Sequence, residues 1–158
     1  MTTTPEGTTA TTGSTDRRFF GHPLALGTVF SVELWERFSF YGMQAVMAYY
    51  LYYAVTEGGL GFPEASATSI IGAYGGLVYL AAVVGAWVAD RLLGAERTLF
   101  FSAIAVMAGH LALAVLPGVA GVAVGLVLVA LGSGGVKTSA TTVVGSLYDR
   151  NDPRADAG

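Results

Sequence analysis

Two long runs without a charged side chain limit what this chain can fold into. The sequence has no Asp, Glu, Lys or Arg from Ala65 to Ala89, and again none from Thr98 to Val136. About 20 apolar residues in a helix cross the roughly 30 Å of hydrocarbon in a bilayer. The first run therefore predicts one membrane-spanning helix. The second is too long for one helix and contains the turn sequence Leu116-Pro117-Gly118, so it predicts two.

The composition agrees with a membrane protein. Hydrophobic residues make up 53% of the 158 residues and charged residues only 12%, whereas soluble domains carry about 25% charged residues. The absence of cysteine excludes a disulfide framework and cysteine-based metal or redox sites, and two histidines argue against a histidine metal centre. The net charge of −3 gives no sign of a nucleic-acid partner. We therefore expect no cofactor, no metal and no nucleic acid.

A further span is predicted upstream, although it carries charges. Residues 21–55 are mostly apolar but include Glu33, Glu36 and Arg37. Either this segment is an amphipathic helix of a soluble protein, or its charges face a protected interior. The uncharged stretches 24–32 and 41–55 favour a span. The predicted order is a disordered cytoplasmic tail (1–20), spans at 21–55, 64–90, 97–116 and 120–147, and the start of a cytoplasmic loop (148–158).

The basic residues predict the orientation. The chain has eight Lys and Arg residues, of which Arg37 and Lys137 lie inside spans. With the N-terminus inside the cell, all the others fall on the cytoplasmic side: Arg17, Arg18, Arg91, Arg97, Arg150 and Arg154. The outside loops then contain Glu57 and Glu64 and no basic residue, which satisfies the positive-inside rule. We expect a multi-pass protein of the cell membrane with a cytoplasmic N-terminus.

The charges of the first span belong to a polar face. At 100° per residue, one helix face carries Glu33, Glu36, Arg37, Phe40, Tyr41 and Gln44. Lys137 in the fourth span makes the interior charge neutral. A static salt-bridge network is one interpretation, but buried ion pairs stabilise poorly, and ionisable groups inside membranes mark ion or substrate pathways. We favour a proton switch, in which protonation of a glutamate releases a cation from its pairing.

Other residues of the spans have simpler interpretations. His110 is the lone histidine of the third span, where a structural hydrogen-bonded group is favoured over a proton relay. Tyr79 lies mid-span, either in the core or on a cavity wall. The patterns Gly72-x-x-x-Gly76 and Gly121-x-x-x-Gly125 predict close helix contacts.

Three segments resemble the proton-coupled oligopeptide transporters, a branch of the major facilitator superfamily. The segment Glu33-Leu34-Trp35-Glu36-Arg37-Phe38-Ser39-Phe40-Tyr41-Gly42 is similar to the family's ExxER motif and the aromatics and glycine that follow it. Residues 85–94 with Arg97 resemble the signature between helices 2 and 3, and Lys137 stands where the family has a lysine in helix 4. Covering residues 20–158, the resemblance implies an all-α membrane protein, the first four transmembrane helices of a major facilitator superfamily N-terminal half.

The resemblance also implies roles for single residues. Glu33, Glu36, Arg37 and Lys137 would couple proton binding to transport, with Lys137 paired with the glutamates of the motif. Asp90 and Arg91 would form a cytoplasmic gating contact. The peptide site would contain Tyr41, Gln44, Tyr79, Phe40 and Lys137. The implied activity is symport of protons with di- and tripeptides, without enzymatic activity. The alternatives are a carrier of another small solute such as nitrate, and a small four-helix membrane protein that does not transport.

The sequence departs from the family at some positions. Phe40 stands where many bacterial members have tyrosine, and Gln44 where many have arginine. Gly72 occupies the position of a histidine that mammalian members use, which favours the glutamates of the first span as the proton site. Because the superfamily builds its path from two six-helix halves, four helices predict a truncated chain. We expect it to be inactive alone and to need its missing C-terminal helices, besides peptide, protons and lipid.

Overall fold

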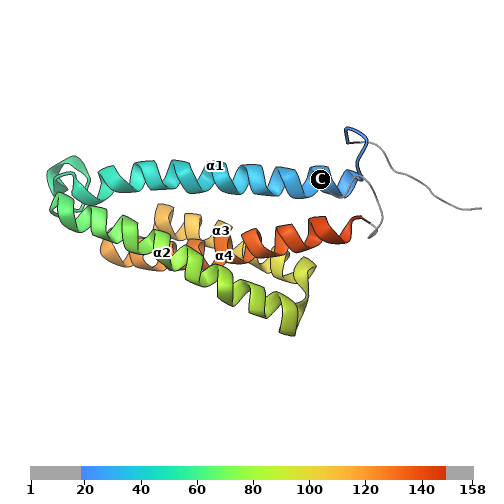
Figure 1. Cartoon of the computed structure of the whole chain (residues 1–158). Helices are drawn as coiled ribbons and strands as arrows, with labels where there is room; N and C mark the ends of the chain where they lie inside the picture. Colours follow the sequence, from blue (N-terminus) through green and yellow to red (C-terminus); the bar gives the residue numbers. More distant parts are fainter. Residues whose placement is uncertain (1–18, 149–158) are drawn as a thin grey trace, which may run out of the picture.

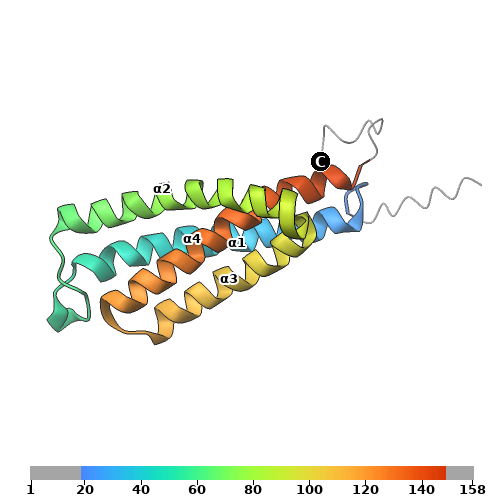
Figure 2. The ribbon, with the colours of Figure 1, turned by 90° about the horizontal axis from the view of Figure 1, so that it is seen from below.

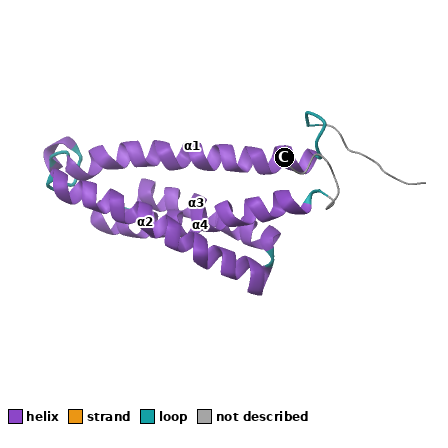
Figure 3. Cartoon of the chain, in the orientation of Figure 1, coloured by secondary structure: helices purple, strands orange, loops and turns teal. Residues whose placement is uncertain are grey.

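Four long helices make up most of the described part of the chain. The computed structural model describes residues 19–148 and shows each helix antiparallel to the next (Figure 1). The elements are α1 (Leu24–Tyr52), a 3-10 turn η1 (Val55–Glu57), α2 (Glu64–Val88), a π-helical turn η2 (Ala89–Leu93), α3 (Ala95–Val115) and α4 (Gly118–Ser146). Over residues 19–148, only helices and loops are drawn in Figure 3. The predicted all-α fold is confirmed.

Three of these helices are long and apolar enough to cross a membrane. They cover Glu64–Leu93, Ala95–Val115 and Gly118–Ser146. Helix α1 has 29 residues, as many as α4, but carries the charges of the ExxER segment. The position of α1 in the bilayer, like the exact limits of all four spans, stays a prediction.

The two ends of the bundle carry different charges. The start of α1, the α2–α3 junction and the end of α4 lie at one end (Figure 1). Arg91 and Arg97 belong to this junction, whereas Glu57 and Glu64 belong to the α1–α2 connection at the opposite end. A hydrogen bond of 2.8 Å between His22 Nδ1 and the Tyr148 hydroxyl joins the start of α1 to the end of α4. The other arginines predicted to be cytoplasmic, Arg17, Arg18, Arg150 and Arg154, lie outside the described residues. The same holds for residues 1–18 of the predicted tail (1–20) and residues 149–158 of the predicted loop (148–158).

The junction between α2 and α3 is more helical than expected. The gap predicted between the second and third spans, residues 91–96, is occupied by the end of the π-helical turn and the beginning of α3. Only Gly94 separates them, with a φ of 80°. Glycine reaches this left-handed region without steric cost, so the chain reverses within one residue. The Gly94 N–H donates to the Ala89 carbonyl at 3.0 Å and closes the π turn.

Helix α4 is the centre of the bundle. It packs most extensively against α3 and then against α2, and far less against α1. Figure 2 shows α4 running between α2 and α3. Glycines make this possible. A Cβ atom added at Gly85 of α2 would lie 2.8 Å from the Gly135 Cα, and one at Gly134 would lie 2.5 Å from the Ala81 backbone. The backbones of α2 and α4 are therefore in direct contact.

The two glycine patterns behave differently. A Cβ atom at Gly125 would collide with the Leu113 side chain of α3, so the predicted contact at Gly121-x-x-x-Gly125 is confirmed. Around Gly72 and Gly76, nothing in residues 19–148 lies within 4 Å of an added Cβ. The prediction of a close contact at this pattern is wrong within the described bundle, because this face of α2 points away from α4.

The glycine contact predicts a stability difference. Gly85→Ala should push α2 and α4 apart and destabilise the bundle by about 1–3 kcal/mol, the usual cost of overpacking. Gly72→Ala is the matched control in the same helix, and it should cause no loss because alanine is the better helix former. Thermal unfolding of the purified chain in detergent measures both. Equal midpoints for the two variants would contradict the close α2–α4 contact.

Candidate functional site

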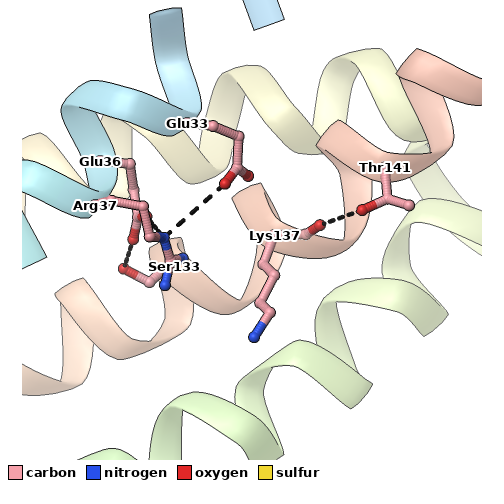
Figure 4. A network of polar contacts seen from close by, with 6 residues as sticks. All are labelled: Glu33, Glu36, Arg37, Ser133, Lys137 and Thr141. Atoms are coloured by element: carbon pink, nitrogen blue, oxygen red, sulfur yellow. Dashed lines mark hydrogen bonds and ion pairs between the residues drawn. The ribbon is translucent and has the colours of Figure 1, made fainter. Parts of the chain in front are cut away.

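A buried glutamate lies at the contact between α1 and α4. Glu36 is the only charged residue that is buried within residues 19–148, with 6% of its surface exposed. Its Oε1 accepts a hydrogen bond of 2.5 Å from the Ser133 hydroxyl of α4 (Figure 4). Its Oε2 lies 2.6 Å from Nε of the neighbouring Arg37. The carboxylate is thus held from two sides, by a neutral donor on one helix and a cation on its own.

Arg37 connects the two glutamates of the ExxER segment. Its Nε lies 3.9 Å from Oε2 of Glu33, one turn earlier in α1, so that pair is looser than the pair with Glu36. The guanidinium also lies over the Phe40 ring, 5.5 Å from its centroid. Phe40 in turn stacks on Tyr74 of α2, with centroids 5.7 Å apart. Charge and aromatic contacts therefore join α1 to α2.

Lys137 does not contact the glutamates in this structure. Within residues 19–148, no carboxylate oxygen lies within 4.0 Å of its ammonium. The Nζ instead lies over the ring of Tyr79 on α2, 5.1 Å from the centroid. The pairing with the motif's glutamates that the resemblance implied is therefore not formed. The reason is local: Ser133, one turn earlier on α4, makes the contact with Glu36, and the Lys137 side chain points away from Glu33 (Figure 4).

Two grooves nevertheless bring Lys137 near acidic residues. One, of about 420 Å³ between α1 and α4, is lined by Glu33 and Lys137 together. The other, also about 420 Å³ and between α2 and α4, is lined by Tyr79, Asp90 and Lys137. The ammonium group can thus serve either groove by rotation of its flexible side chain.

The remaining predicted residues spread over the bundle. Tyr41 is 63% exposed and Tyr79 is 70% exposed. The Tyr41 ring contacts Phe40 edge to face at 5.4 Å. Gln44 is half-buried one turn further along α1, without a polar contact in the described residues. Asp90 and Arg91 lie on the π-helical turn, both exposed, and form no ion pair with another residue of the described range.

Sequence reasoning missed Ser133 and Tyr74. Ser133 precedes Lys137 by four residues and so shares its helix face. That spacing was the available signal. Tyr74 is 4% exposed, and its hydroxyl has no hydrogen-bond partner in the described chain. Nothing in the sequence distinguished it from the other apolar and aromatic positions of α2.

Comparison with known proteins places these features in a family. The PTR2 pattern of the POT family matches residues 96–158. The di-/tripeptide transporter of Lactococcus lactis subsp. lactis is 49% identical over 146 residues, which are 91% of this chain and 29% of that protein. Dipeptide and tripeptide permease A of Escherichia coli is 35% identical over 92% of this chain and 28% of its own length.

Solved structures of peptide transporters are also similar to this chain. A crystal structure of a peptide transporter POT in complex with sulfate has a TM-score of 0.85 and 47% identity, covering 88% of this chain and 28% of that one. A POT family transporter in complex with 5-aminolevulinic acid has a TM-score of 0.86 and 40% identity, over 89% of this chain and 29% of the other. The chain spans less than a third of the length of these relatives. The chain is thus similar to the POT family of transporters, whose family model matches residues 96–158.

Proposed function

We propose that the protein containing this chain carries di- and tripeptides across the cell membrane together with protons. The observation that supports this most is the buried carboxylate of Glu36, held between Ser133 and Arg37. Its segment belongs to a chain 49% identical to a di-/tripeptide transporter. A protein that only needed to fold would gain little from such a group, because burying an ion costs more than its pairing returns.

Glu36 is the proton site in this proposal. In the ionised state Glu36 pairs with Arg37 and accepts a hydrogen bond from the Ser133 hydroxyl. A proton on Glu36 removes the closer of the two carboxylates that face Arg37, which leaves the guanidinium with the looser contact to Glu33 at 3.9 Å. The interior charge of Glu33, Glu36, Arg37 and Lys137 then changes from neutral to positive. A positive site attracts an anionic group, and the substrate carboxylate supplies one.

Lys137 and the aromatic residues bind the peptide in this proposal. A peptide is a zwitterion, with an ammonium group and a carboxylate. The Lys137 ammonium matches the carboxylate, and Glu33 lines the same groove with the opposite charge. Tyr79 holds the ammonium of Lys137 over its ring. The other proposed substrate residues are Tyr41, Phe40 and Gln44.

The membrane placement is part of the proposal. All four helices would cross the cell membrane, with the N-terminus, Arg91 and Arg97 on the cytoplasmic side as the positive-inside rule requires. Asp90 and Arg91 would then form a cytoplasmic gate on the π-helical turn, a helix irregularity frequent at functional sites. The proposal contains no catalytic residue and no cofactor, since the function is transport and not catalysis.

A small zwitterion other than a peptide is the second candidate substrate. A POT family transporter of 40% identity has been solved with 5-aminolevulinic acid, which carries one amine and one carboxylate. The same pair of charged groups would bind it. An inorganic anion such as nitrate lacks the amine and would use only the cationic residues.

Uptake into proteoliposomes tests the substrate class. The protein encoded by the complete reading frame around this sequence should accumulate labelled dialanine under an inward proton gradient, because the gradient drives symport. A protonophore should abolish the accumulation. Accumulation of 5-aminolevulinic acid or nitrate without dialanine would contradict the peptide assignment.

Substitution of the charged residues tests the coupling. Glu36→Gln should reduce proton-driven dialanine accumulation to background, because the amide cannot take up a proton, whereas counterflow exchange should persist. Lys137→Ala should abolish both, because the substrate carboxylate loses its partner. Ser146→Ala is the control in the same helix, since its exposed hydroxyl donates to the Val143 carbonyl at 2.7 Å and lines neither groove beside Lys137. Normal accumulation by both charge variants would show that the cluster is structural.

The cation–π contact predicts a difference between two changes at one position. Tyr79→Leu removes the ring under the Lys137 ammonium and should raise KM for dialanine about three- to tenfold, which corresponds to the strength of such contacts. Tyr79→Phe keeps the ring and should leave KM near the wild-type value. If the phenylalanine variant is impaired as much as the leucine variant, the Tyr79 hydroxyl and not its ring is responsible.

A further inference from the structure

A third groove opens on Glu36 from the side of α3. It lies between α1 and α3, has a volume of about 520 Å³, and its walls are mostly apolar, with Trp35 and Met107 among them. Two of its lining residues are ionisable, Glu36 from α1 and His110 from α3. The groove shares no residue with the two grooves that Lys137 lines. The proposed transport function uses Glu36 and gives no role to His110.

Two residues that line the groove each have a buried polar atom without a hydrogen-bond partner in the described residues. His110 Nε2 is buried and makes no hydrogen bond within residues 19–148. Glu36 Oε2 is close to Arg37 Nε, at 2.6 Å, yet neither atom makes a properly aligned hydrogen bond there. The second carboxylate oxygen therefore retains capacity to accept. A buried polar atom without a partner is costly, and a water molecule between two such atoms removes that cost.

The other groups around Glu36 are already engaged or lie elsewhere. From α1, Arg37 is paired with it and Glu33 is held by Arg37. From α4, Ser133 bonds to Oε1 and Lys137 is directed to Tyr79. The Tyr74 hydroxyl of α2 is buried without a partner in the described residues, but Tyr74 does not line the groove. From α3, His110 is the ionisable residue that lines the groove.

We propose that His110 is a positioning residue for proton uptake at Glu36. Its neutral imidazole donates from Nε2, through one water molecule in the groove between α1 and α3, to Glu36 Oε2. A hydrogen bond to the ionised carboxylate favours the ionised form, so His110 sets the pH at which Glu36 accepts its proton. This inference rests on the proposed function in one respect, that Glu36 is the proton site.

The pH dependence of dialanine uptake tests the role of His110. His110→Leu removes the donor and should move the midpoint of the uptake profile to higher pH by about one unit, because the ionised form loses a hydrogen bond. His110→Gln places an amide N–H near the position of Nε2 and should keep the wild-type midpoint. Met107→Leu changes the same groove wall without changing a donor, and should also keep it.

Two outcomes would overturn the proposal. One is a wild-type midpoint in His110→Leu. The other is a shift in His110→Gln as large as in His110→Leu, because titration of the histidine itself would then be responsible. If His110→Leu does not fold, His110→Asn replaces it. Its shorter side chain lacks a donor at the Nε2 position, so the same upward shift is expected and a wild-type midpoint overturns the proposal.

An infrared titration separates this inference from the proposed function. The carbonyl band of protonated Glu36 is identified by its loss in Glu36→Gln, and its midpoint is measured in purified protein without any transport. The midpoint should move upward in His110→Leu and stay in His110→Gln. A wild-type protein that carries no peptide would refute the proposed function, and the band would still decide whether His110 acts on Glu36.

Discussion

The hydrocarbon of a bilayer offers no hydrogen bonds, so the protein itself must provide partners for every charge inside the bundle. Glu36 shows how this is done. Its two oxygens are contacted by Ser133 and Arg37, at 2.5 and 2.6 Å. Because Ser133 comes from α4 and Glu36 from α1, their hydrogen bond also fixes the register of the two helices. The antiparallel arrangement then brings Lys137 and Glu33, each one turn away, to the same groove.

The glycines of α4 and its polar contact are parts of one arrangement. Ser133 lies between Gly132, whose added Cβ would collide with Val106 of α3, and Gly134, whose Cβ would collide with α2. These contacts hold α4 between its two neighbours and leave the Ser133 side chain directed toward α1. Larger residues at these positions would move α4 away and lengthen the bond to Glu36. Small residues on α4 therefore determine where the contact between Ser133 and Glu36 can form.

The sequence predicts the fold better than the site. Long uncharged runs and the ExxER segment led to four helices and to the family, since hydropathy and a specific motif are local signals. The partner of Lys137 was predicted wrongly, because a long flexible side chain can reach Tyr79 or Glu33 from the same backbone position. Gly72 and Gly125 occur in the same pattern, yet only Gly125 contacts a helix in the described bundle. Whether the glycine face of a helix meets another helix depends on how the helices pack, which the local sequence does not contain.

The modest packing of α1 against α2 and α4 has a thermodynamic consequence. The main polar contact of α1 with α4 is the hydrogen bond of Glu36, so protonation of this proposed proton site would loosen α1. Linkage is reciprocal, and any agent that displaces α1 must strengthen proton binding by the same factor. A lipid or inhibitor wedged beside α1 would therefore act on this protein as a more acidic medium does. In this bundle, displacement of α1 and a lower pH would both favour the protonated form of Glu36.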